Sequence, residues 1–442
     1  MRNSVVVIIL LCVFSCQQPS RPLPSFESKA ISGVVTAMTD VMIHDITNPP
    51  LAARFFSYAC LSGYEVIAQN DSNFKSLYKV LNGYPSISRP DSIQGYHVEI
   101  SALLAMMETA KKMQPSGKKI DLYEQQFLDS CKTAGYPMET LENSLAYASY
   151  ISKKILAYAK GDKYNRISNY PRYTPMNKPG YWYPTAPAYM AAVEPYFNTV
   201  RTFVLDSCNQ FMPVPPVPFS TDKRSAFYQM LRHNYDETVN MPAEHRAIAA
   251  FWDCNPFAVQ DDGHLILGLK KISPGAHWLG IAGVACKQAH KSFAESMQIF
   301  TMVSIGLTDA FIACWDEKFR SNRIRPETAI RNAIDPHWQP LLQTPPFPEY
   351  LSGHSVISSA SATILSHYFG DHFAYTDSVE VSYGLPPRHF NSFRQAAEEA
   401  AISRFYGGIH FMDAIENGLV TGRQVGELVV NRAITRLGAP TR

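Results

Sequence analysis

Three short groups of polar residues in the second half of the chain have the side chains that bind an anion. The first contains Lys318 and Arg325, seven positions apart. Seven residues make almost two turns of an α-helix, so we expect both cations on one helix face, and Pro326 disfavours further helix. Two cations on one face would attract an oxyanion. A solvated basic face balanced by nearby acidic residues would have the same pattern.

The second group follows a proline-rich loop and opens an apolar segment. Ser352 stands where a helix N-cap is expected, and the free N–H groups of a first helical turn favour a negatively charged oxygen. Gly353 lets the backbone approach a ligand closely, and His354 can exchange protons near neutral pH. The alternative is a capping serine beside an ordinary surface histidine.

The third group lies near the C-terminus. Arg404 offers a planar fork suited to tetrahedral oxyanions. Gly407 and Gly408 are poor helix residues and would open the turn, so that His410 could face the same cavity as Arg404. A helix end with a satisfied core histidine would explain the same residues.

Helices must position these groups, because apolar residues recur every three or four positions over most of the chain. Alternating apolar and polar runs are missing, so we predict an all-α fold of two packed helical bundles with little sheet. The predicted helices cover residues 51–68, 97–113, 141–159, 222–237, 242–254, 276–291, 293–318, 354–369, 391–406 and 412–435.

The chain has 442 residues, a length that indicates roughly two domains. Stretches rich in tyrosine, proline and glycine occur at 170–187 and 211–219. We therefore predict an N-terminal helical domain over 17–220 that includes this crossover. A C-terminal helical bundle over 221–442 would carry the anion site.

Composition excludes two classes of protein. Hydrophobic residues make up 46% and charged residues 18%, which is typical of a folded chain and not of a disordered one. Lys plus Arg is 40 and Asp plus Glu is 38, a net charge of +2, which disfavours a dedicated nucleic-acid binder. Six cysteines beyond residue 16 are widely scattered without a Cys-x-x-Cys motif, so we expect buried core residues and see no metal-ligand spacing.

The N-terminus has the pattern of an export signal. Arg2 precedes an apolar run over 5–13, and the run ends near Cys16. The residues before Cys16 resemble a bacterial lipobox, which predicts a signal peptide over 1–16, a lipid anchor at Cys16, and a periplasmic or outer-membrane lipoprotein. Plain secretion is the alternative. The apolar stretch 299–315 contains Asp309 and is expected to be a buried core helix.

Taken together, the three groups resemble a known superfamily. Lys-x6-Arg-Pro, Ser-Gly-His and Ser-Arg-x5-His, in this order, are similar to the motifs of the type 2 phosphatidic acid phosphatase and vanadium haloperoxidase superfamily, over about residues 300–430. Phe-Pro-Glu-Tyr at 347–350 and Tyr-Gly-Gly-Ile-His-Phe at 406–411 look like bacterial vanadium-dependent haloperoxidases, in particular iodoperoxidases. Leu351 departs from the family, which usually has proline there; this change removes no ligand.

The resemblance implies a vanadate cofactor and a peroxidase reaction. His410 would coordinate vanadium, and His354 on the opposite side would shuttle a proton to or from hydrogen peroxide. Halide would be oxidised to hypohalous acid, which then halogenates small organic acceptors; iodide or bromide is favoured over chloride. Vanadate oxygens would be held by Lys318, Arg325, Ser352, the N–H of Gly353, and Arg404. Lys318 would also withdraw charge from the bound peroxide and so take part in catalysis.

Further roles are implied at the edge of this site. Trp315 and Phe347 would line the pocket and contact the halide. Basic clusters need carboxylates to orient them, so Asp253, Asp316 and Asp413 are candidates to pair with Arg404 or Lys318.

Two other functions remain open. A soluble acid phosphatase would use the same pocket, with His410 attacking phosphorus to form a phosphohistidine and His354 protonating the leaving oxygen. A non-enzymatic binding lipoprotein with a relic site is disfavoured, because every expected ligand residue is present.

Overall fold

The computed structural model describes residues 25–187, 189–261, 266–268 and 271–435. The predicted signal peptide and the lipid anchor at Cys16 lie outside the described residues. Within them, the fold is helical with very little sheet, so the predicted all-α class is confirmed.

The first half contains five α-helices. Asn48 caps the second of them, because its side chain accepts the N–H of Leu51 at 2.9 Å and prolines occupy the first turn. The first and fourth helices were not predicted from the sequence. The elements are α1 (Ser28–His44), α2 (Pro49–Asn70), α3 (Val98–Met113), η1 (Gly117–Lys119), α4 (Ile120–Thr133), α5 (Met138–Lys160), η2 (Tyr164–Asn169) and η3 (Phe197–Thr199).

The second half contains eight α-helices within the described residues, and seven of them agree with the predicted segments to within a few residues. The exception is the short α10. The elements are α6 (Ala226–Val239), α7 (Ala243–Phe251), α8 (Pro274–Gln288), α9 (Phe293–Ser321), α10 (Pro326–Ala333), α11 (Gly353–Phe369), η4 (Val379–Tyr383), α12 (Phe393–Tyr406), α13 (Met412–Val429) and the π-turn η5 (Val430–Ile434). Two antiparallel pairs of three-residue strands, β1 (Val259–Asp261) with β2 (Ile266–Gly268) and β3 (Tyr375–Asp377) with β4 (Arg388–Phe390), are the sheet content of the described residues.

Helix α9 is the central element of the fold. It begins with a capping box between Ser292 and Glu295 and packs against α2, α8, α11 and α13. It is the one helix in the described part of the chain that is long and apolar enough to cross a membrane, but its most apolar window is entirely buried inside the molecule. The prediction of a buried core helix is therefore confirmed.

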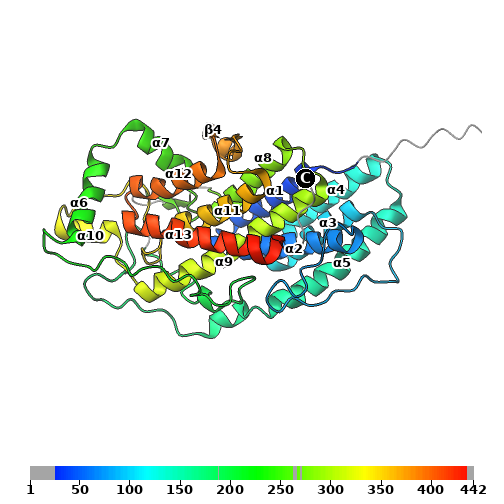
Figure 1. Ribbon diagram of the computed structural model, residues 1–442, viewed down its shortest axis with the longest axis horizontal. Coiled ribbons are helices and arrows are strands. Elements are labelled where there is room, and N and C mark those ends of the chain that lie inside the picture. Colours follow the sequence, from blue (N-terminus) through cyan, green and yellow to red (C-terminus); the bar gives the residue numbers. More distant parts are fainter. Residues whose placement is uncertain (1–24, 188, 262–265, 269–270, 436–442) are drawn as a thin grey trace, which may run out of the picture.

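The two halves share one core. In Figure 1, α2, α3 and α5 gather at one end of an elongated molecule and α6, α7 and α10 at the other, with α9 and α11–α13 between them. The largest cluster of buried apolar side chains extends from Ile31 to Ile434. The domain boundary near residue 220 stays a prediction. The six described cysteines are free, and all except the half-buried Cys208 are buried, as expected.

One expectation about local geometry is wrong. Helix α9 ends at Ser321, because Asn322 adopts a left-handed conformation with φ 52°. Arg325 is the N-cap residue of α10, and Pro326 begins that helix. Lys318 and Arg325 therefore do not share a helix face; a break in the chain between two helices brings them to the same site.

Candidate active site

Three cations from three separate segments are buried together at the centre of the C-terminal half. Lys318 and Arg325 have no exposed surface and Arg404 is 1% exposed. Burial lowers the pKa of Lys318 to about 7 and that of Arg325 to about 10, and it also lowers the pKa of Arg404. Cations held away from water in this way favour a bound anion, as the sequence predicted.

Two of the cations organise the loop that precedes Ser352. The ammonium group of Lys318 donates to the carbonyl oxygens of Pro348 at 2.9 Å, Glu349 at 3.0 Å and Leu351 at 2.5 Å. Arg325 Nε donates to the carbonyl of Phe347 at 2.9 Å, whereas its buried Nη2 has no hydrogen-bond partner. The lysine therefore holds the backbone of the loop, and the arginine keeps a donor for a ligand.

His410 lies in contact with Arg325. Its Nε2 is 3.1 Å from Arg325 Nη1, and its Nδ1 is 2.8 Å from Glu349 Oε1. A guanidinium group can only donate, so Nε2 is the accepting nitrogen and Nδ1 carries the proton toward the carboxylate. Burial, together with Arg325 and Lys318, lowers the pKa of His410 well below its usual range. The imidazole is thus neutral, with the lone pair of Nε2 among the cations.

Sequence reasoning assigned no role to Glu349, which holds His410 in this state. Its Oε1 also accepts the N–H of Phe411 at 2.9 Å, and its Oε2 accepts from Arg323 Nε at 2.6 Å. Arg323 in turn makes a bidentate pair with Asp413 at 2.6 and 2.7 Å. Glu349 is fully buried, and its place in the Phe-Pro-Glu-Tyr stretch was the available signal.

The predicted pairing of aspartates with Lys318 or Arg404 is wrong. Asp413 pairs with Arg323, Asp316 with Arg320, and Asp253 with Lys271. The helix break at Asn322 turns the chain, so that Arg323 takes the Asp413 carboxylate, while Asp316 and Asp253 each pair with a different cation.

Arg404 is held by backbone and hydroxyl groups instead. Its Nη2 donates to the carbonyl oxygens of Trp252 at 2.7 Å and Ala249 at 3.4 Å, and its Nε donates to Ser403 Oγ at 3.0 Å. Asp253 acts at longer range, where its charge raises the pKa of Arg404 against the effect of burial. The guanidinium group is thus fixed without a paired carboxylate, so its charge remains for a ligand.

The residues around Ser352 are placed as the sequence predicted. The Ser352 Oγ accepts the N–H of Ser355 at 3.3 Å, so it caps α11, which begins at Gly353. An added Cβ at Gly353 would lie 3.8 Å from the ring of Trp315, in the cavity that both residues line.

The His354 imidazole is half-buried and lines the same cavity, and its Nε2 atom is buried. Burial holds its pKa well below the usual range, with Arg404 and His410 as the next causes, while a hydrogen bond to the Trp252 backbone acts the other way. Its Nε2 has no partner, so Nδ1–H is the group that donates the hydrogen bond to the Trp252 carbonyl. The unprotonated Nε2 of His354, with its free lone pair, therefore points away from that carbonyl.

Arg404, Gly353, His354 and His410 line a cavity of about 40 Å³, whereas Lys318, Arg325 and Ser352 are not among its lining residues. Trp315 and Phe347 form an apolar wall with ring centroids 4.9 Å apart, and Lys318 and Arg325 each lie 5.1 Å from the centre of the Phe347 ring. His410 reaches the cavity because α12 ends at Tyr406 and Gly408 turns the chain with φ 72°. The cavity is lined by Pro49, Cys254, Asn255, Pro256, Phe257, Pro274, Phe311, Trp315, Pro345, Phe347, Gly353, His354, Arg404, Ile409 and His410.

The residues present fit a tetrahedral oxyanion such as vanadate or phosphate. Arg325 Nη2 and His354 Nε2 are buried polar atoms without partners, and such atoms are rare in folded proteins unless a ligand satisfies them. Arg325 contacts the neutral Nε2 of His410, and the charges of Lys318 and Arg404 also help to lower the pKa of this histidine. The predicted convergence of Lys318, Arg325, Arg404 and His410 is therefore what the structure contains.

Comparison with known proteins gives the family. A family model described as the second helical-bundle domain of VCPO matches residues 298–336 and 332–438. The crystal structure described as the first bacterial vanadium-dependent iodoperoxidase is 42% identical in sequence, with a TM-score of 0.87, and the match covers 92% of this chain and 97% of that one. The chain belongs to the vanadium-dependent haloperoxidase family.

Two more distant structures share the fold of this family member. A holo-type bacterial vanadium-dependent chloroperoxidase is 16% identical with a TM-score of 0.70, covering 95% of this chain and all of that one. The apo-type chloroperoxidase is 17% identical with a TM-score of 0.69, covering 88% and 95%. A search of curated proteins gave no significant match.

Proposed function

We propose that this protein is an enzyme that binds vanadate and uses hydrogen peroxide to oxidise a halide to hypohalous acid. The observation that carries the proposal is the neutral Nε2 of His410, which lies among three buried cations in a chain 42% identical to a vanadium-dependent iodoperoxidase. Small organic molecules would be the final acceptors of the halogen.

The roles of the site residues follow from their free atoms. His410 would coordinate vanadium through Nε2, with Glu349 fixing the ring through Nδ1–H, a pattern common around metal-bound histidines. Vanadate oxygens would be held by Arg325 Nη2, Arg404, Ser352 and the N–H of Gly353. Lys318, which the sequence predicted as a direct ligand of vanadate, donates to three loop carbonyls, so it would contribute its charge to the site. Bound vanadate supplies the Lewis-acid centre that activates peroxide.

His354 would act as the proton carrier of the reaction. Its pKa lies well below the usual range, so it is an unprotonated base in the free site, and its unpartnered Nε2 can accept a proton from incoming peroxide. Arg404 and His354 share the carbonyl of Trp252, which places the base beside the anion.

Trp315 and Phe347 would form the halide pocket, in which iodide or bromide is favoured over chloride. An apolar wall removes water from the halide, and removing water costs less for a large anion than for a small one. Phe347 lies against two of the cations, so a halide there would remain near positive charge.

A second candidate activity is acid phosphomonoester hydrolysis. His410 donates its Nδ1–H to Glu349 and keeps an unprotonated Nε2. A histidine in this state could also act as a nucleophile and attack phosphorus. His354 would then protonate the leaving oxygen.

One assay separates the two activities. Purified protein is supplied with vanadate, hydrogen peroxide and iodide, bromide or chloride, and the same preparation is tested with p-nitrophenyl phosphate. We expect vanadate-dependent oxidation of iodide or bromide. Phosphatase turnover without halide oxidation would assign the second activity.

We also propose that the protein is exported and anchored to a membrane through a lipid at Cys16, as its N-terminal sequence predicts. Mass spectrometry of the mature N-terminus tests this: a diacylated Cys16 is expected, and an unmodified N-terminus from cleavage elsewhere would indicate plain secretion.

A further inference from the structure

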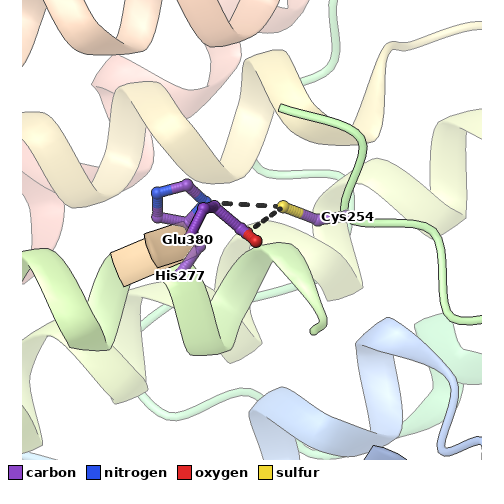
Figure 2. Close-up of side chains that lie close together, drawn as sticks. All are labelled: Cys254, His277 and Glu380. Carbon is purple, nitrogen blue, oxygen red and sulfur yellow. Dashed lines mark hydrogen bonds and ion pairs between the residues drawn. The ribbon is translucent and has the colours of Figure 1, made fainter. Parts of the chain in front are cut away.

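Next to the anion site, three potential metal ligands from distant parts of the sequence meet in a buried cluster. Cys254 follows α7, His277 lies in the first turn of α8, and Glu380 belongs to η4. Figure 2 shows the three side chains pointing toward one another. Among the residues that the structure describes, this is the one group of three or more His, Cys, Asp or Glu ligand atoms arranged closely enough to hold a metal ion.

We propose that Cys254, His277 and Glu380 bind a zinc ion. The Cys254 Sγ lies 3.5 Å from His277 Nδ1 and 3.7 Å from Glu380 Oε1, and His277 Nδ1 lies 3.3 Å from Glu380 Oε1. Tetrahedral zinc with ordinary bond lengths places its sulfur about 3.5–3.6 Å from a nitrogen or oxygen ligand, and nitrogen and oxygen about 3.3–3.4 Å apart. The observed triangle matches these separations, and a water molecule would complete the tetrahedron.

The second ring nitrogen of His277 strengthens this assignment. His277 Nε2 is 2.7 Å from Asp377 Oδ2, a normal hydrogen bond to a carboxylate, whereas Nδ1 is 3.3 Å from Glu380. An imidazolium clamped between two carboxylates would make two short charge-assisted bonds of about 2.7–2.9 Å. One short and one long contact leave Nδ1 as the more weakly bonded nitrogen, so Nδ1 can ligate zinc while Nε2–H donates to Asp377, the carboxylate–histidine–zinc arrangement. Burial lowers the pKa of His277, but the facing Asp377 carboxylate and the neighbouring hydrogen bonds raise it well above its usual value, so zinc would displace the Nδ1 proton.

The chemistry of the cluster favours zinc among common ions. A thiolate, an imidazole and a carboxylate in four-coordinate geometry are typical zinc ligands, whereas magnesium and calcium require mainly oxygen. Burial raises the pKa of the Cys254 thiol, so the metal-free cluster keeps the sulfur protonated. Zinc binding would therefore release the Cys254 thiol proton, and it would also release the Nδ1 proton of a doubly protonated His277.

The cluster is reachable and adjoins the reactive groups. Glu380 lines a cavity of about 480 Å³, which gives an ion an access route, and Cys254 lines the anion cavity on the other side. Trp252, two residues before Cys254, stacks on the His277 ring with centroids 4.7 Å apart and accepts from Arg404. A zinc ion here would fix the segment that positions Arg404 and His354.

Metal analysis of the untagged full chain tests the proposal. Zinc and vanadium are quantified separately by mass spectrometry, and chelator-treated protein is titrated with Zn²⁺ and with Co²⁺. We expect one zinc per chain, a higher melting temperature on zinc addition, and a thiolate-to-cobalt charge-transfer band in the near ultraviolet. Failure to retain one equivalent of either ion, or cobalt binding without the thiolate band, would overturn the site.

Variants locate the ligands. Cys254→Ala and the volume-conserving Glu380→Gln should each lower zinc affinity at least tenfold, whereas Cys286→Ala, which removes another buried cysteine, should retain zinc. Circular dichroism confirms folding, and if Cys254→Ala does not fold, Glu380→Gln and the cobalt spectrum of the parent decide the case. Full zinc retention by folded Cys254→Ala or Glu380→Gln protein would refute the assignment. The test is independent of halide oxidation.

Discussion

Two buried polar clusters meet at the segment 252–254, and they are opposite in charge and in construction. On one side, Arg404 and His354 hydrogen-bond to the backbone of Trp252 within a site of three cations. On the other side, Cys254 belongs to a cluster of thiol, imidazole and carboxylate groups. The cationic site is built for an anion and the anionic cluster for a cation, and one short segment connects them.

The two clusters are also stabilised differently. Carbonyl oxygens hold Lys318 and Arg404, so both keep an unneutralised charge. In the other cluster, the Asp377 carboxylate fixes His277 and the remaining ligands face one another. The uncompensated charge in each cluster therefore indicates the charge of the ligand that the cluster binds. Changes among the cationic residues should therefore alter vanadate binding without altering zinc content.

The largest expected effect follows the loss of the nitrogen at the centre of the cationic site. His410→Ala removes the proposed vanadium ligand, so we expect loss of vanadate retention and a decrease of at least about 10³-fold in iodide oxidation. Equilibrium dialysis and an oxidation assay measure these. His337→Ala, on an exposed loop, is the matched control. Iodide oxidation at the parent rate in the His410 variant would refute the site, and altered zinc content would refute the independence of the two clusters.

The next effect separates turnover from binding. His354→Ala removes the proton carrier but none of the three cations, so we expect kcat to fall by about 10²–10⁴-fold while vanadate still binds. Steady-state kinetics over peroxide concentration, beside dialysis with vanadate, distinguish the two. Loss of vanadate binding equal to that of His410→Ala would show that His354 acts mainly in holding the anion.

A smaller effect is expected for the carboxylate behind His410. Glu349→Gln keeps a hydrogen-bond acceptor but removes the charge that faces His410 Nδ1–H and Arg323. We expect vanadate affinity to fall about 10–100-fold, as for other groups that orient metal ligands. The free energy of unfolding in urea, measured in parallel, shows how much stability is lost through the weakened Arg323–Glu349 pair. Unchanged affinity in a folded variant would mean that His410 does not need this carboxylate.

Much of this arrangement could be predicted from the sequence. Helix periodicity and caps such as Asn48 and Ser352 are local signals, so most helices and the N-terminus of α11 agreed with expectation. The three motif groups also identified the cations and both histidines of the site. Local spacing was misleading only where the chain breaks, at Asn322, so that the helix-face argument for Lys318 and Arg325 failed although both reach the site.

The rest depends on long-range packing. Glu349 contacts His410 across 61 positions of sequence, and its carboxylate has no spacing that marks it. His277 and Asp377 are 100 positions apart, and Cys254 and Glu380 are 126 apart. No local motif marks residues so far apart, which is why the sequence showed no metal-ligand spacing. The fold nevertheless places Cys254, His277 and Glu380 in one cluster. Of the expected aspartate partners, Asp413 pairs with Arg323 across 90 positions, whereas Asp316 pairs with Arg320 within one helical turn.

The smallest expected effect is the dependence of anion binding on pH. Burial lowers the pKa of Lys318 to about 7 in the free site, and a bound anion would raise it, so the charged lysine contributes fully below about pH 7. Oxyanion affinity should therefore fall as pH rises above about 7, up to the higher pKa of the bound complex. The stability of the anion-free protein changes in the opposite direction: the unfolded chain holds the Lys318 proton more tightly than the folded one, so stability rises from about pH 7 toward about pH 10.5.

Lys318→Met isolates this contribution, because phosphate and vanadate titrate in the same range in both proteins. We expect the parent to bind phosphate more tightly than the variant at about pH 6, and this advantage to shrink about tenfold or less by about pH 9. Calorimetric titration at each pH measures the ratio of the two affinities. A ratio independent of pH would show that Lys318 stays charged throughout, and that its bonds to three loop carbonyls outweigh its burial.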